Sequence, residues 1–373
     1  MSFEAVTTFT LDVFYELYAL QNSTGNIGFS GTALYFLMGA ISIGLRGISY
    51  DQLTGILQQE DEELSKYETW ENSETARKWT KFLEDMYIAM TVSQSLYYHG
   101  QLNDHYTIIS GDIFRLNKKP IDASNKAEIL RKIKGWYFKN EKSMKIWHVV
   151  EESINSDDKI LFMSEISFDL NWKEEFDTSN NEICGFFSDD GEEIPVCMMS
   201  QVGRHNLYDQ PENKFKILFK PFKENKLYAA IVLPKHDLKL LHVHHLIKWD
   251  KIQKYFKESI SLKVHLRMPK FTIDIEYDFV TSLKNLGVKD IFYKGTFDFR
   301  PMTNRSVFIG NILQVVSFSL DEFGVNIATD EENRIPIEEY DEKFDVDRTF
   351  LFFIYSHKDK HIHYSAVVNK PTY

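Results

Sequence analysis

The feature that most constrains the fold of this 373-residue chain is a long charged segment between two strand-like segments. Residues 307–321 and 350–356 have the apolar or alternating composition of strands. Between them, residues 328–344 include seven acidic and two basic residues. A loop of this length without structure of its own is uncommon inside a compact chain and is usually functional. The sequence therefore predicts an exposed functional loop that is held by a strand at each end.

The composition is that of a folded protein with a large core. Apolar residues make up 43% and aromatic residues 14% of the chain, which excludes disordered, collagen-like and low-complexity proteins. The 43 basic and 55 acidic residues give a net charge of −12, and such a surface repels the phosphate backbone of nucleic acids. Cys184 and Cys197 cannot form a disulfide framework and lack the spacing of a metal site. We therefore expect no nucleic-acid partner, and we expect the two thiols to be buried or unreactive.

Neither a signal peptide nor a membrane span is visible in the sequence. Glu4 and Asp12 interrupt the apolar positions of the first thirty residues, so no cleavable signal peptide is predicted. The best candidate for a span, residues 27–45, contains Ser30, Thr32 and four glycines and is typical of a buried helix with its lead-in. We expect a protein with no membrane partner that is cytoplasmic or secreted without a cleavable signal peptide, with an extracellular location as the alternative.

Hydrophobic periodicity divides the chain into a helical part, about residues 1–158, and a β-rich part, about residues 159–373. The acidic run at 60–63 is interpreted as a solvated face. No repeat of fixed period and no Pro/Gly/Ser-rich linker divides the chain, so residues 1–373 are predicted to form a single α+β domain. In the first part we expect a strand at 86–97 and helices at 3–21, 33–45, 49–57, much of 58–85, 101–111 and 124–140.

Several segments, taken in order, resemble the motifs of one family, the serpins. Residues 26–52 are similar to the family's buried second helix with its lead-in and following turn, and residues 161–176 to its central strand. Residues 268–271, Met-Pro-Lys-Phe, are the most specific local match. Residues 319–324 look like the strand that feeds the family's reactive loop, and residues 344–354 look like the strand after it. The resemblance covers nearly the whole chain.

The resemblance implies a large central, mostly antiparallel β-sheet with further sheets, about eight or nine helices, and an exposed reactive loop at about residues 324–345. In the family, the loop is bait for an endopeptidase. After cleavage it inserts as a strand into the main sheet and distorts the trapped protease. Serine endopeptidases are the implied targets, with cysteine endopeptidases as a second class. The protein itself is expected to be a monomer without enzymatic activity, cofactor or metal.

The resemblance also assigns candidate site residues. The family's spacing from Gly324 places the cleaved bond between Glu338 and Glu339. The hinge of the loop is then formed by Glu322, Gly324, Val325, Ile327 and Thr329, and the sheet-opening region by Ser30, Ser164, Trp172 and Gln314.

Some of these residues depart from the family's pattern. Inhibitory serpins place small residues at the first positions that turn inward on insertion, whereas Val325 and Ile327 are bulky. Glu331 would become an unpaired buried carboxylate, which is costly. Ser164 and Gln314 stand where the family usually has Asn and His. A non-inhibitory serpin that acts as a binding, carrier or chaperone-like scaffold is therefore the alternative function.

Enzyme and metal-site interpretations have less support. His242, His244 and His245 form a cluster, and His361 and His363 have the spacing that puts two imidazoles on one strand face. No third ligand is identifiable, so we interpret these histidines as solvated residues at a helix start and a strand end. The sequence contains neither a phosphate-binding Gly-rich loop nor a Gly-x-Ser-x-Gly elbow, so it gives no positive support for catalysis.

Overall fold

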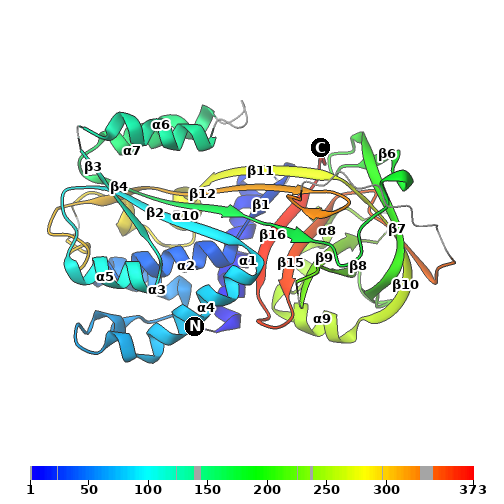
Figure 1. The fold of residues 1–373 in the computed structure, drawn as a ribbon, viewed down its shortest axis with the longest axis horizontal. Coiled ribbons are helices and arrows are strands. Elements are labelled where there is room, and N and C mark those ends of the chain that lie inside the picture. The colour runs from blue at the N-terminus through cyan, green and yellow to red at the C-terminus, as the bar shows by residue number, and fades with distance from the viewer. Residues whose placement is uncertain are drawn as a thin grey trace.

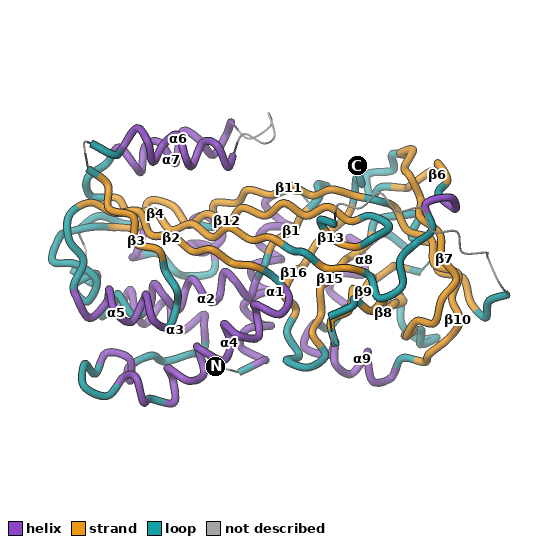
Figure 2. Tube along the Cα trace, in the orientation of Figure 1, coloured by secondary structure: helices purple, strands orange, loops and turns teal. Residues whose placement is uncertain are grey.

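The strands that the structure describes form two sheets, and most helices lie at one end of the long axis (Figure 2). The structure is a computed structural model, and it describes residues 2–22, 24–122, 124–137, 144–224, 226–235, 238–295, 297–327 and 339–373.

The central sheet contains one parallel pair of strands between antiparallel ones. β2 is antiparallel to β4, and β11 is antiparallel to β12, but β4 and β12 run parallel, from Lys159 beside Phe308 to Ser167 beside Ser317. We call this parallel pair the seam. A strand that entered the seam in the opposite direction would be antiparallel to both neighbours. The order across the sheet is β3 (Asn117–Ile121), β2 (Thr91–His99), β4 (Lys159–Ser167), β12 (Phe308–Leu320) and β11 (Phe271–Asp278).

The second sheet is antiparallel except where β14 joins β10. Its central strands β15 and β16 are buried along their whole length, which explains their nearly unbroken apolar sequences. The order is β1 (Ile27–Phe29), β16 (Ile362–Val368), β15 (Phe350–Ser356), β9 (Leu227–Pro234), β8 (Phe215–Pro221), β7 (Glu193–Tyr208), β10 (Ile260–Pro269) and β14 (Glu342–Asp345), with β6 (Glu182–Phe187) on β7.

Helices cover both faces of the central sheet (Figure 1). On one side lie α1 (Phe3–Leu20), α2 (Gly31–Ser42), α3 (Gly47–Leu57), α4 (Glu74–Ala89) and α5 (Asp104–Asp112). On the other side lie α6 (Lys126–Tyr137) and α7 (Met144–Asn155). The remaining helices are α8 (Leu240–Val243), α9 (Ile252–Glu258) and α10 (Val280–Asn285). With the single turn α8 set aside, the described residues contain nine α-helices, in agreement with the expected eight or nine.

Helix α4 extends further than the sequence analysis predicts. Trp79, Phe82 and Met86 recur at helical spacing and are all buried, so the helix continues to Ala89. The predicted strand at 86–97 is therefore wrong for its first residues, and β2 begins at Thr91.

Helix α7 is not among the predicted helices. Its Val150 and Ile154 form a small hydrophobic cluster with Leu161 of β4 and Leu313 of β12, separate from the main core. Because Leu161 and Leu313 belong to the two strands of the seam, α7 covers the seam from outside.

The acidic run at 60–63 is exposed as expected at its three glutamates but not at Asp61. The Asp61 carboxylate is buried and accepts hydrogen bonds from Ser42 Oγ at 2.7 Å and Trp79 Nε1 at 2.8 Å. Burial raises the pKa of the Asp61 carboxyl, and the two hydrogen bonds oppose this shift. Asp61 is therefore a structural carboxyl beneath a solvated surface.

Candidate functional site

The charged loop leaves the central sheet after β12 and returns to the second sheet at β14, which pairs in parallel with β10. On the entry side the described residues end at Ile327, and they resume at Glu339, which is exposed. The predicted site residues Thr329 and Glu338 lie outside the described residues, as does Glu331.

The first residues of the loop already lie within the sheet. After the turn at 321–323, β13 (Gly324–Val325) pairs antiparallel with both β12 and β5 (Leu170–Asn171), the short strand that follows β4. Gly324 has φ 148°, and a Cβ at this position would lie 1.9 Å from the carbonyl oxygen of Leu170. This position therefore requires glycine. Val325 is fully buried between the two strands, so its bulk is accommodated at the hinge.

Asn326 closes the end of the seam. Its φ of 56° lies in the left-handed region, which asparagine tolerates better than most residues, and this turns the chain out of the sheet. The Asn326 carboxamide donates hydrogen bonds to the carbonyl oxygens of Phe168, just after β4, and Ser317 of β12, both at 3.0 Å. It also accepts one from Ser319 N at 2.8 Å. One side chain thus bridges the ends of the two strands of the seam.

The turn that precedes β13 is fixed by Trp172. The Trp172 backbone N donates to Phe323 O at 2.8 Å, and its Nε1 donates to Asp321 O at 3.0 Å. The indole stacks on Phe222 with ring centroids 4.6 Å apart, which holds it in place.

A buried ion pair anchors the same turn. Glu322 is only 3% exposed, and its Oε1 lies 2.5 Å from Lys270 Nζ. The side-chain amide of Asn181 also donates to Glu322, and Phe176 N donates to Glu322 O at 3.0 Å. The hinge turn is therefore held by backbone hydrogen bonds and by the ion pair of Glu322 with Lys270.

Comparison with known proteins places this loop and its sheet in a family. A family model described as Serpin (serine protease inhibitor) matches residues 4–371. The chain belongs to the serpin family. Serpin B11 of Mus musculus is 24% identical over 371 residues, which cover 94% of this serpin and 95% of the relative. The leukocyte elastase inhibitor of Xenopus tropicalis is 22% identical, and the match covers 98% of both chains.

Solved structures share the fold of this serpin over nearly its whole length. Native protease nexin-1 with heparin has a TM-score of 0.80 at 19% identity and covers 99% of this chain and 98% of its own. Thyroxine-binding globulin in complex with thyroxine has a TM-score of 0.79 at 16% identity and covers 99% of both chains. At such identities the likeness shows the fold alone, and it confirms the expected α+β serpin fold.

Three of the four predicted sheet-opening residues of this serpin lie together at the seam. Gln314 of β12 is the register partner of Ser164 of β4. The Gln314 amide makes two hydrogen bonds with the backbone of Ser30: its Oε1 accepts from Ser30 N at 2.8 Å, and its Nε2 donates to Ser30 O at 3.0 Å. All three residues are completely buried. Gln314 therefore ties β12 to the N-terminus of α2, whereas Trp172 lies apart from them, at the hinge turn.

The predicted site omitted Asn326 and Lys270. Lys270 belongs to the Met-Pro-Lys-Phe motif that carries the resemblance. Asn326 interrupts the strand-like run after Gly324, and an asparagine in such a run is a signal for the left-handed region.

The five histidines of the two predicted groups differ in burial. His361 and His363 have ring centroids 6.3 Å apart, but His363 is completely buried rather than solvated as predicted. Burial lowers the pKa of His363 to about 3 and that of His361 to about 4. His242 and His245 are exposed. The part of the chain that the structure describes contains no group of three or more His, Cys, Asp or Glu side chains that could hold a metal ion.

None of the described helices is long and apolar enough to cross a membrane.

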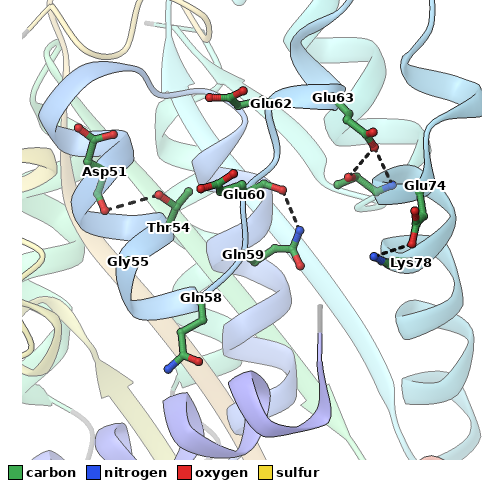
Figure 3. Close-up of a pocket in the computed structure, with 11 residues that line it drawn as sticks. Asp51, Thr54, Gly55, Gln58, Gln59, Glu60, Glu62, Glu63, Glu74 and Lys78 are labelled. Atoms are coloured by element: carbon green, nitrogen blue, oxygen red, sulfur yellow. Dashed lines mark hydrogen bonds and ion pairs between the residues drawn. The ribbon is translucent and has the colours of Figure 1, made fainter.

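A hollow between α3 and α4 is lined mainly by acidic and polar side chains (Figure 3). Glu74 is paired with Lys78 at 2.8 Å, and Glu63 accepts a hydrogen bond from Thr75 Oγ1 at 2.8 Å. Asp51 and Glu60 complete the rim. The hollow is built from elements that do not hold the loop, so we do not assign it to the site.

Proposed function

We propose that this serpin inhibits an endopeptidase and uses residues 324–345 as a cleavable bait loop. Cleavage between Glu338 and Glu339 would free the loop, which would then enter the seam as a new strand. The observation that carries the proposal is the position of β13, which already lies antiparallel between β12 and β5 at the end of the seam. The loop residues that follow would continue this strand in the same direction.

Insertion would replace the parallel pair of the seam with two antiparallel pairs. Each inserted residue would add hydrogen bonds to the sheet, and every second side chain would reach the core. This gain supplies a driving force that would pull the protease along while it is still joined to the loop as an acyl-enzyme. Serine endopeptidases that accept an acidic residue are the proposed targets, with cysteine endopeptidases as the second class.

The test is incubation with a panel of serine and cysteine endopeptidases, followed by denaturing electrophoresis. We expect a covalent complex that survives denaturation, with release of a fragment that begins at Glu339. Thr329→Arg places a charge at an inward position and should allow cleavage but abolish the complex, because burying the guanidinium opposes insertion. Asp330→Arg, at the neighbouring outward position, is the matched control and should still form the complex. Cleavage of the wild type without any complex would contradict the proposal.

The second candidate is a non-inhibitory serpin that acts as a binding, carrier or chaperone-like scaffold. Ile327 and Glu331 favour it, because both would turn inward on insertion and neither is small. The fold is compatible with carriage of a small molecule, since thyroxine-binding globulin shares it. If the cleaved protein melts at the same temperature as the intact one, the loop does not insert and the scaffold function is favoured.

A further inference from the structure

A lysine lies completely buried behind the hinge turn. Lys220 of β8 is 0% exposed, and its Nζ donates hydrogen bonds to the backbone oxygen of Glu174 at 2.7 Å and to Gln201 Oε1 at 2.5 Å. The ammonium lies 4.9 Å from the ring centroid of Trp172 and 4.5 Å from that of Phe176. Among the described residues no carboxylate lies within ion-pair distance of Lys220. The charge is therefore met only by neutral oxygens and aromatic faces.

Lys220 contacts the segment that holds the hinge. Trp172 and Phe176 donate their backbone N–H groups to Phe323 and Glu322 of the hinge turn, and the same two rings lie against the ammonium. Gln201 Nε2 adds hydrogen bonds to the backbone oxygens of this segment, residues 172–176. Lys220 and the hinge turn therefore contact the same short segment, residues 172–176.

The charged and titratable groups around Lys220 do not neutralise it. Glu174 and Glu175 lie on the same segment, and Glu175 is already paired with Lys223 at 3.0 Å. His205 of β7 is 2% exposed, and burial together with the charge of Lys220 lowers its pKa to about 3, so it is neutral near pH 7. Burial lowers the pKa of Lys220 to about 7, and the two glutamates offset only part of this shift.

We propose that Lys220 is a proton-coupled latch on the hinge, and that release of residues 172–176 and of the turn at 321–323 is accompanied by proton uptake at this lysine. An ammonium without a carboxylate partner is costly to bury, so the charged form favours the open state in which water reaches it. In water a lysine has a pKa of about 10.5. Between that value and about 7, opening binds a proton, and lowering the pH makes opening easier. Below about pH 7 both states are charged and the dependence levels off.

This inference names a regulation of the proposed inhibitor, but its test needs no protease. Hydrogen exchange of the intact protein is followed by mass spectrometry from pH 6 to 9.5, with rates corrected for the intrinsic effect of pH. Peptides covering 170–177 and 319–327 should become better protected as the pH rises above 7, by up to about tenfold per pH unit. Peptides from β15 and β16 should not change in this way.

Lys220→Met keeps the length of the side chain and removes the charge. In this variant, the protection of peptides 170–177 and 319–327 should therefore not depend on pH. Gln201→Leu removes one acceptor from the ammonium, which lowers the pKa of Lys220 further and should move the onset of the dependence to lower pH. The second variant decides the case if Lys220→Met does not fold. A wild type without pH dependence in these peptides, or an unchanged dependence in either folded variant, overturns the latch. A protein that shows the latch but forms no covalent complex would contradict the proposed function alone.

Discussion

At the scale of single residues, Glu322 is the hinge side chain whose loss should cost most. Glu322→Ala leaves the largely buried Lys270 ammonium without its carboxylate, and breaking a buried pair costs about 3 kcal/mol. We expect the free energy of unfolding, measured by urea denaturation, to fall by about that amount. Glu339→Ala, at an exposed position, should change it by less than about 0.5 kcal/mol. Equal effects of the two variants would mean that the pair does not anchor the turn.

His363 gives a second prediction at the same scale. Its pKa is about 3 in the folded protein and about 6.5 in the unfolded chain, so unfolding binds a proton between these values. Stability should therefore fall as the pH drops from 6.5 towards 3. We expect His363→Leu to flatten this loss in urea titrations at several pH values, whereas His242→Leu, at an exposed position, should not. Parallel curves for wild type and His363→Leu below pH 6.5 would contradict the prediction.

At the scale of elements, α7 should open independently of the main core. Ile154→Ala removes a buried contact from the small cluster over the seam and should destabilise that cluster by about 2 kcal/mol. The amides of α7 should then exchange faster, while those of β15 and β16 are unchanged. Val149→Ala, on an exposed face of the same helix, is the control. The proposed insertion would separate β4 from β12, so Ile154→Ala should also speed it after cleavage. Faster exchange throughout β15 and β16 would show that α7 is not a separate unit.

The elements differ in how well the sequence predicts them. Buried helices such as α2 and long apolar strands such as β15 follow from composition and periodicity. Helix α7 was missed although Val150 and Ile154 have helical spacing, because its polar neighbours resemble a connection between the helical and β-rich parts. Lys220 could not be identified, because a lysine near the end of an apolar strand usually reaches solvent, and only the packing of residues 172–176 over it excludes water.

At the scale of the whole molecule, cleavage of the loop should raise stability. Limited proteolysis should cut between residues 328 and 343 before any other place, because this stretch is long, charged and poor in apolar anchors. Calorimetry should then show the cleaved protein melting well above the intact one. Glu331→Thr should enlarge the gain, because it removes a carboxylate that insertion would bury. First cuts at 58–80, or an unchanged melting temperature after cleavage, would contradict this prediction.

The place of β15 and β16 in the second sheet has a consequence for biosynthesis. These strands lie between β1 and β9, yet residues 350–368 leave the ribosome after nearly everything that packs against them. Until they arrive, β1 and β9 have open edges, which are templates for pairing with other chains. The second sheet of this serpin is therefore completed only after residues 350–368 have been synthesised, and until then its open edges expose the nascent chain to aggregation.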